Sequence, residues 1–304
     1  MKNKKIRKIN REYGHIFAEI RKEKGYSQHE IEDSNVSAAS ISRFERGETM
    51  IGTDSFMEIL ENIGVSAAEF EYISYQLSNS LDLFPSYWAL TKAANSNNLP
   101  LMEILLDKIE RRIQLQPNIK RFRLDKILAE TVIFHLDATR KVPSEEVKFL
   151  THFLKNTKYW GHYEVTLISW TTEILEKETL NLLLNQMFTK NKSKLYSFND
   201  NKLFIDTSLN ILDTFLTRKD LVSAKDALFE LENYDIHPQL LFEKMELKYD
   251  KARFNFLSDF EAEFALKEMW YYYDVLKYTE NYELANIVRN EIGCLIKDKD
   301  KNRA

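Results

Sequence analysis

The chain has 304 residues, of which 44% are hydrophobic, and its formal net charge is −4. This length and composition allow one large domain or two smaller ones with a real core, and the net charge does not suggest a bulk polyanion binder. The single cysteine, Cys294, excludes an intrachain disulfide and a cysteine-based zinc site within one chain.

Membrane and export signals are not expected. No stretch reaches the run of about 18 apolar residues that a membrane span needs. The N-terminus is basic, but the apolar run of a signal peptide does not follow it. We therefore expect a cytoplasmic protein that makes no contact with a membrane.

Glycine and proline are rare, with 7 and 5 residues, so tight turns are few and the predicted fold class is all-α. Five of the seven glycines fall within the first 64 residues, which predicts short helices there and longer helices afterwards. Residues 1–46 hold 11 Lys and Arg against 7 Asp and Glu, whereas the remainder is acidic. A basic head on an acidic body is typical of a protein that binds DNA through its head.

Five short helices are predicted in the first 70 residues. The first covers residues 13–24 and ends at Gly25, because glycine readily takes the left-handed conformation that closes a helix. Capping patterns place the starts of the other four at Ser27, Ser37, Thr53 or Asp54, and Ser66. Gly47 and Gly64 are expected to end the third and fourth helices.

The second and third of these helices, joined by a tight turn, predict a helix-turn-helix whose third helix enters the major groove of DNA. The stretch SAASISRFERGE, residues 37–48, combines a small face with two arginines, which suits a close approach to base edges. The candidate DNA contacts are Gln28, Ser37, Ala38, Ala39, Ser40, Ser42, Arg43 and Arg46. The alternative is a helical domain in which this helix is only a tight packing surface.

The candidates differ in what they offer to DNA. The methyl groups of Ala38 and Ala39 can meet a thymine methyl, and the serines supply hydrogen bonds. Arg43 can bind guanine in a bidentate manner or clasp a phosphate. Gln28 and Arg46 are placed for contacts with the DNA backbone.

Residues 21–48, RKEKGYSQHEIEDSNVSAASISRFERGE, resemble the Cro/phage-repressor class of helix-turn-helix domains. The patterns R-x-x-x-G-x-S-Q, V-S-x-x-x-I-S and E-x-G stand at the spacings of that class. The resemblance implies that Glu45 pairs with Arg21 and ties the third helix to the first. One departure is the pair Ile31 and Glu32, because the class has a small residue after the aliphatic one, so packing there is expected to differ slightly.

From Tyr87 onward the pattern predicts long helices with short breaks, two helices in about 40 residues, as in stacked helical-hairpin repeats. The domains are therefore placed at residues 1–70 and 71–304. Breaks are expected near residues 97–100, 116–118, 141–144, 158–161, 191–200, 218–220, 235–238 and 281. A generic helical bundle is the alternative, since no clean repeated consensus is found.

Several of these helices carry a second, non-core face with polar and aromatic side chains. Amides and arginine on such a face can hold the backbone and terminal carboxylate of an extended peptide on the concave surface of a helical stack. The candidate peptide-binding residues are Thr166, Trp170, Asn210, Tyr249 and Arg253. Each of them also fits an ordinary interhelical contact or a solvated face.

The head motif, followed by YWGHYEVTLISW at residues 159–170, is similar to the Rgg/GadR/MutR family of regulators over the full length of the chain. The W-G-x-Y-E element of the family is carried by Trp160, Gly161, Tyr163 and Glu164. The resemblance implies a homodimer, a tetratricopeptide-like body and, in many members, a short secreted peptide as ligand. The aromatic stretch at residues 269–278 fits the core, the dimer interface or the wall of the peptide groove, and the core or the dimer interface is favoured.

The sequence thus predicts a cytoplasmic, homodimeric regulator of transcription that binds double-stranded DNA and is controlled by a short signalling peptide, as in quorum sensing. The alternative is a DNA-binding regulator without a peptide ligand, whose body serves only dimerisation or protein partners. An enzyme, a metal or a cofactor is not expected. The six histidines lack metal-ligand spacing, and no phosphate-loop or serine-hydrolase motif is present.

Overall fold

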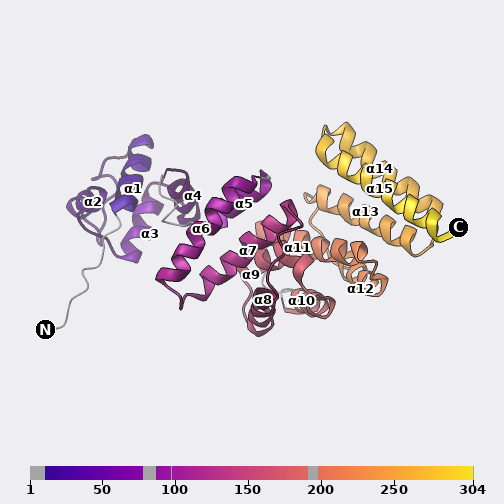
Figure 1. The fold of residues 1–304 in the computed structure, drawn as a ribbon. Helices are drawn as coiled ribbons and strands as arrows, with labels where there is room; N and C mark the ends of the chain where they lie inside the picture. Colours follow the sequence, from indigo (N-terminus) through magenta and orange to yellow (C-terminus); the bar gives the residue numbers. More distant parts are fainter. Residues whose placement is uncertain (1–10, 78–86, 97, 191–197, 304) are drawn as a thin grey trace. The chain divides into compact units, whose positions relative to one another are not determined.

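The computed structural model describes residues 11–77, 87–96, 98–190 and 198–303 (Figure 1). Within these ranges every regular element is a helix and no strand occurs, so the all-α prediction is confirmed. The chain divides into two compact units, residues 1–101 and 102–304. The predicted domain boundary after residue 70 falls inside a helix of the first unit. No helix in the described ranges is long and apolar enough to cross a membrane.

The first unit contains α1 (Arg11–Glu23), α2 (Ala38–Glu45), α3 (Thr53–Asn62), α4 (Ala67–Leu77) and α5 (Tyr87–Asn95). The helices α1 to α4, which we call the head, enclose one apolar core. Phe44 lies at its centre, with its ring centroid 6.0 Å from Phe17 and 5.9 Å from Phe56. Burial of each such side chain stabilises the head by about 1.5–3 kcal/mol.

The predicted second helix does not form, and this prediction was wrong. Residues 28–30 make a turn, and no α-helix lies between α1 and α2. The capping box itself is present, because the Ser27 N–H donates to Glu30 Oε2 at 2.7 Å and the Glu30 N–H donates to Ser27 Oγ at 3.3 Å. These bonds close one turn, but the chain does not continue as a helix.

The reason is found a few residues further along. Asp33 Oδ1 accepts the backbone N–H groups of Asn35 at 2.7 Å and of Val36 at 3.0 Å. A short acidic side chain that satisfies these donors locally competes with helical hydrogen bonds and turns the chain. The residues from α1 to α2 are therefore a hydrogen-bonded turn segment, and the described part of the head has four helices instead of the predicted five.

The other helix ends follow the local signals with one exception. Ser37 caps α2, and Gly25, Gly47 and Gly64 have φ values of 81°, 67° and 63°, as expected for residues that close helices. The exception is α3, which begins after Gly52 and has no side-chain cap, so the predicted cap by Thr53 or Asp54 is wrong.

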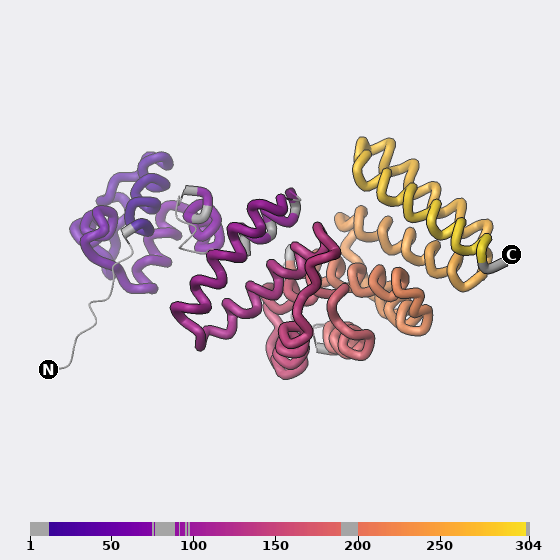
Figure 2. Tube along the Cα trace, viewed as in Figure 1, coloured from indigo at the N-terminus to yellow at the C-terminus, as the bar shows by residue number. Residues whose placement is uncertain are grey.

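The second unit contains most of α6 (Leu99–Leu115) and all later helices. These are α7 (Lys120–Leu136), α8 (Ser144–Asn156), α9 (His162–Thr171), the short η1 (Thr172–Ile174), α10 (Lys177–Lys190), α11 (Phe198–Thr217), α12 (Leu221–Glu232), α13 (Leu241–Leu257), α14 (Ala262–Tyr278) and α15 (Tyr282–Arg303). In this unit α7, α9, α11 and α13 pack successively in one layer, and α8, α10 and α12 form a second layer (Figure 2). We call the second unit the body.

The predicted breaks coincide with helix ends, although those near residues 97–100 and 191–200 include residues outside the described ranges. Two breaks were not predicted, at residues 172–176 and 258–261. Neither contains glycine or proline. At the second one Asp259 and Glu261 take left-handed conformations with φ of 59° and 46°, which end α13 without a glycine.

Candidate DNA-binding and peptide-binding sites

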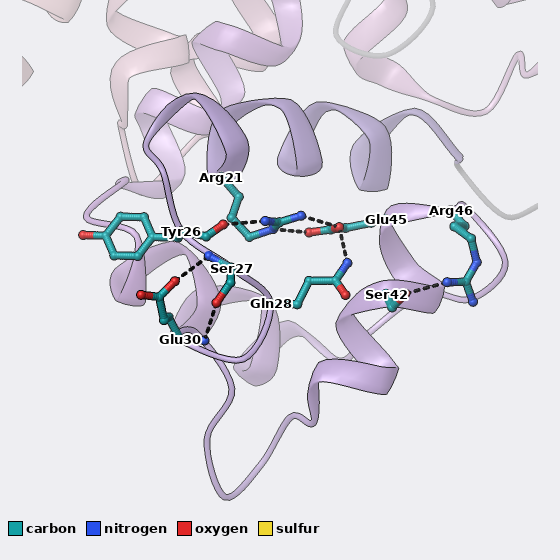
Figure 3. Close-up of polar contacts among 8 residues, drawn as sticks. All are labelled: Arg21, Tyr26, Ser27, Gln28, Glu30, Ser42, Glu45 and Arg46. Atoms are coloured by element: carbon teal, nitrogen blue, oxygen red, sulfur yellow. Dashed lines mark hydrogen bonds and ion pairs between the residues drawn. The ribbon is translucent and has the colours of Figure 1, made fainter.

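A buried ion pair fixes α2 to α1 (Figure 3). Arg21 donates from Nε to Glu45 Oε1 at 2.6 Å and from Nη2 to Glu45 Oε2 at 2.8 Å. The remaining Nη1 donates to the carbonyl oxygen of Tyr26 at 2.5 Å. Gln28 Nε2 adds a bond to Glu45 Oε2 at 2.6 Å. The expected pairing of Arg21 with Glu45 is confirmed, and it also holds the turn segment.

The backbones of α1 and α2 approach each other closely at Gly14. A Cβ atom on this residue would lie 1.9 Å from the carbonyl oxygen of Phe44, which is far inside van der Waals contact. Only glycine therefore allows α2 to lie where it does. Together with the ion pair, this contact sets the orientation of α2 within the head.

The exposed face of α2 is small at its start and basic towards its end. Ser40 donates its N–H to Ser37 Oγ at 3.3 Å, and the two hydroxyl oxygens lie 3.1 Å apart. Arg43 is exposed and donates from Nη2 to Ser40 Oγ at 3.5 Å. Ala39 is exposed on the same helix. These four side chains offer hydroxyls, a guanidinium and one methyl group on a single accessible face.

The remaining candidates of the head are held by intramolecular bonds. Ala38 is only 8% exposed, which differs from the expectation that its methyl group meets a thymine. The amide of Gln28 is bonded to Glu45. Arg46 donates to the hydroxyl of Ser42 and forms two bonds with Glu48, at 2.7 and 3.0 Å. The polar side chains of these residues are therefore bonded to other side chains of the head, and they can help to hold α2 in place as well as contact DNA.

In the body, the W-G-x-Y-E element joins α9 to its neighbours. Trp160 Nε1 donates to a backbone carbonyl after α8 at 3.1 Å. The Gly161 N–H donates to Glu164 Oε2 at 2.9 Å, which caps α9. The Tyr163 hydroxyl donates to Asp125 Oδ1 on α7 at 2.8 Å, and burial together with this carboxylate raises the pKa of Tyr163. The element thus holds adjacent helices of one layer together.

The five candidate peptide-binding residues lie on α9, α11 and α13, which belong to the same layer. Trp170 is half-buried, and Thr166 is buried with its hydroxyl donating to the carbonyl of His162 at 2.8 Å. Asn210 Nδ2 donates to Ser169 Oγ at 2.9 Å and so joins α11 to α9. Asn210 thus lies at the contact between these two helices, and Thr166 and Trp170 lie on α9, which is one of the two.

The other two candidates lie further along the layer and are both buried. The Tyr249 hydroxyl donates to Glu291 Oε2 at 2.7 Å. Arg253 Nη1 donates to Asp213 Oδ1 at 2.6 Å and to Asp250 Oδ1 at 2.8 Å, and its Nη2 pairs with Glu291. The two Nη atoms of Arg253 are therefore engaged by three carboxylates, whereas its Nε is buried and has no hydrogen-bond partner among the described residues.

The surroundings of Arg253 on α11 and α13 are acidic. Burial raises the pKa of Glu246 to about 7, and the carboxylates of Asp206, Asp213 and Glu243 add to this shift. Lys202 opposes it and forms ion pairs with Asp206 at 2.7 Å and with Glu243 at 2.8 Å. Burial likewise raises the pKa of Asp250 well above its ordinary value. This part of the layer therefore has more carboxylates than cations to balance them.

In the described ranges no group of three or more His, Cys, Asp or Glu side chains is arranged to hold a metal ion. The residue that sequence reasoning missed in the head is Glu32. Its carboxylate contacts the first turn of α2, because Oε2 accepts the Ala38 N–H at 2.8 Å. The only signal of it in the sequence is the departure from the small residue of the helix-turn-helix class.

Two family models match the chain. One is described as "HTH-type transcriptional regulator Rgg, C-terminal domain" and matches residues 105–290, which is more than half of the chain. The other, described as helix-turn-helix, matches residues 17–70. The first covers most of the body, and the second covers the head from α1 into α4.

Solved structures share the fold of the chain. A putative transcriptional regulator of Listeria monocytogenes EGD-e is 20% identical with a TM-score of 0.74, over 95% of this chain and 98% of that one. The SHP pheromone receptor Rgg2 of Streptococcus dysgalactiae is 20% identical with a TM-score of 0.68, over 92% and 98%. A complex of PrgX with cCF10 is 15% identical with a TM-score of 0.66, over 94% and 92%.

Proposed function

Because this chain belongs to the Rgg family of HTH-type transcriptional regulators, we propose that a short signalling peptide, bound by its body, controls DNA binding by its head. The chain is a transcription regulator with an N-terminal helix-turn-helix domain. Control by a peptide is supported by one observation. Over more than nine-tenths of its length the chain shares its fold with a pheromone receptor and with a regulator solved together with cCF10.

The reading surface is the exposed face of α2. Ser37, Ala39 and Ser40 contact base edges, and Arg43 binds guanine or a phosphate. Gln28, Ser42 and Arg46 supply contacts to the DNA backbone or hold the contacting side chains in place. The support for this assignment is the accessibility of these residues and the rigid anchoring of α2 by Arg21 and Glu45.

The regulator acts in the cytoplasm as a homodimer, so that two heads bind half-sites about 34 Å apart, one turn of DNA, or a multiple of this distance. The support for a second copy is an apolar stripe on α14. Phe264, Tyr271 and Tyr278 are 58%, 68% and 90% exposed and stand seven residues apart, which places them on one face of the helix.

The peptide binds along the layer of α9, α11 and α13, where Thr166, Trp170, Asn210, Tyr249 and Arg253 lie. The excess of carboxylates around Glu246 and Asp213 favours a peptide that places its amino terminus or a basic side chain there. A peptide that binds one arrangement of the dimer more tightly than another shifts the population of the two and thus the spacing of the heads.

A regulator without a peptide ligand is the alternative that the sequence left open. Asn210, Tyr249 and Arg253 have partners on neighbouring helices, which is typical of side chains that hold helices together, and the Thr166 hydroxyl is bonded within its own helix. In this case the body serves dimerisation or protein partners, and the head binds DNA in the same way.

Native mass spectrometry of the purified chain, incubated with short peptides from spent culture medium, distinguishes the two. We expect a dimer with one or two peptide adducts, and a matched change in operator affinity when that peptide is added. Arg43→Ala is the control, because it should lose DNA affinity and keep the adduct. A dimer without adducts across several media, or an adduct that leaves operator affinity unchanged, contradicts peptide control.

A further inference from the structure

We propose that Glu32 is a positioning residue for DNA recognition, which sets the first turn of α2 by accepting a backbone hydrogen bond from it. The inference rests on the proposed role of α2 as the reading helix. It concerns the turn segment between α1 and α2, which has no helix of its own.

The first turn of any α-helix leaves backbone N–H groups without partners inside the helix. In α2 two side chains supply these partners. Ser37 Oγ accepts the Ser40 N–H at 3.3 Å, and Glu32 Oε2 accepts the Ala38 N–H at 2.8 Å. Ser37 is the ordinary cap beside the helix, whereas Glu32 reaches back from six residues earlier in the chain and so fixes the helix start against the turn segment.

The turn segment depends on acidic side chains throughout. Glu30 holds the Ser27 N–H, and Asp33 holds the N–H groups that follow it. Ile31, between them, is fully buried in the core of the head. The segment is therefore anchored to the core by Ile31. The next residue, Glu32, links the segment to α2 through its hydrogen bond with the Ala38 N–H.

The charge of Glu32 matters for DNA as well. Glu32 Oε1 lies 3.2 Å from His29 Nδ1, and both side chains are exposed near the start of α2. The hydrogen bonds from the Ala38 N–H and from His29 lower the pKa of the Glu32 carboxyl, so this group stays ionised near neutral pH. A carboxylate at this end of the helix repels phosphates and occupies an N–H group that would otherwise bind one.

Glu32 therefore contributes in two ways. It fixes the geometry of the reading face, which raises the ratio of specific to random affinity. Its charge weakens attraction to DNA of any sequence, which lowers both affinities alike and leaves the ratio unchanged. The two contributions can be separated. Glu32→Gln keeps an oxygen that accepts the Ala38 N–H and removes the charge. Glu32→Ala removes both. A positioning role thus predicts that these two variants differ, although each loses one negative charge.

The test is binding of the full chain to a duplex selected from a randomised library and to a random duplex at one salt concentration. For Glu32→Ala we expect the ratio of specific to random affinity to fall about fivefold, the usual effect of losing one helix cap. The base preference at positions near the start of α2 should broaden. For Glu32→Gln the ratio should stay within about twofold of the original, with thermal unfolding of the variants recorded alongside.

A second variant removes the donor. Ala38 is the first residue of α2, a position that tolerates proline, and Ser37 before it has an extended backbone that proline accepts. Ala38→Pro has no N–H group for Glu32 to accept, so adding Glu32→Ala in that background should leave the affinity ratio unchanged. A full further drop, or equal ratios for the Gln and Ala variants, would overturn the inference.

Comparing Glu32→Ala with Arg43→Ala shows whether only the role of Glu32 fails or the role of α2 as the reading helix fails as well. If Arg43→Ala alters the selected bases and Glu32→Ala does not, Glu32 is not a positioning residue, and α2 remains the reading helix. Arg43→Ala alters no selected base if Arg43 binds a phosphate, so a variant that combines it with Ser37→Ala and Ser40→Ala completes the test. If neither this combined variant nor Glu32→Ala alters the selected bases, α2 does not read DNA and both proposals fail.

Discussion

Two buried arginines, one in each unit, are held in different ways. In the head, Arg21 faces one carboxylate, that of Glu45, and its remaining donor meets a backbone carbonyl. In the body, Arg253 meets carboxylates from three helices: Asp213, Asp250 and Glu291. The first network is balanced in charge, whereas the second has more carboxylates than cations, of which Asp250 is buried and Asp213 and Glu291 are partly exposed.

The difference suggests different uses. A balanced buried pair has no spare charge to offer, so it fixes geometry, here the orientation of α2. A network with more carboxylates than cations responds to protons and to cationic ligands, because either one relieves repulsion between the carboxylates. The ion pair in the head thus fixes the orientation of α2. In the body, the electrostatic repulsion around Arg253 falls when a proton or a cationic ligand binds there.

Of the variants that test this comparison, Glu45→Ala should have the largest effect on stability. It leaves the Arg21 guanidinium buried without its carboxylate, and we expect the head to lose about 3–5 kcal/mol of stability. Specific DNA binding should be lost with it, because α2 is no longer held against α1. Chemical denaturation and DNA titration measure the two effects, with the exposed Glu61→Ala as control. A loss below about 1 kcal/mol would contradict the structural role of the pair.

Gly14→Ala tests the same joint without touching a charge. The new Cβ atom would meet the Phe44 carbonyl oxygen, so the helices must move apart, at an expected cost of about 1–3 kcal/mol. Gly293→Ala is a matched control, because no atom lies within 4 Å of a Cβ at that position. Equal unfolding midpoints for the two variants would show that α1 and α2 do not need this close approach.

The pH dependence of the body is the third prediction. The pKa of Glu246 is raised to about 7 in the folded state from an ordinary 4.5, so the folded chain holds this proton more tightly than the unfolded chain. Its contribution to stability is fully present below about pH 4.5 and is lost as the pH rises through about 7. We expect the body to unfold more easily at pH 7.5 than at pH 5.5.

Tryptophan fluorescence reports on this transition, because Trp160, Trp170 and Trp270 all lie in the body. Glu246→Gln should make the unfolding midpoint less dependent on pH in this range, since glutamine cannot titrate. A midpoint of the original chain that does not change between pH 5.5 and 7.5, or an unchanged dependence in Glu246→Gln, argues against an excess of negative charge around Glu246.

Asp250→Asn should have the smallest effect. It removes one of three carboxylates from Arg253 and leaves two, so we expect the free energy of unfolding to change by less than about 1 kcal/mol. The matched variant in the head is Glu45→Gln, which removes the one carboxylate that pairs with Arg21 among the described residues and should cost clearly more. Equal losses measured by chemical denaturation would mean that the two networks do not differ as described.

Much of the local structure is predictable from the sequence. Ser37 as a cap and the glycines at 25, 47 and 64 act on their immediate neighbours, and all do so in the structure. The pairing of Arg21 with Glu45 was available only through the resemblance to a known class, since 24 residues separate the two partners. The unpredicted breaks at residues 172–176 and 258–261 lack glycine and proline, so composition gave no signal there.

The sequence by itself determined that the chain is helical, that α2 is a short capped helix with small and basic side chains, and that residues 1–46 are basic whereas the rest of the chain is acidic. These properties depend on neighbours along the chain or on totals. Only the tertiary structure decided that Ala38 is buried, that a turn replaces the second helix, and that three carboxylates surround Arg253. Each of these depends on which helices pack together, because burial and charge balance are set by residues distant in sequence.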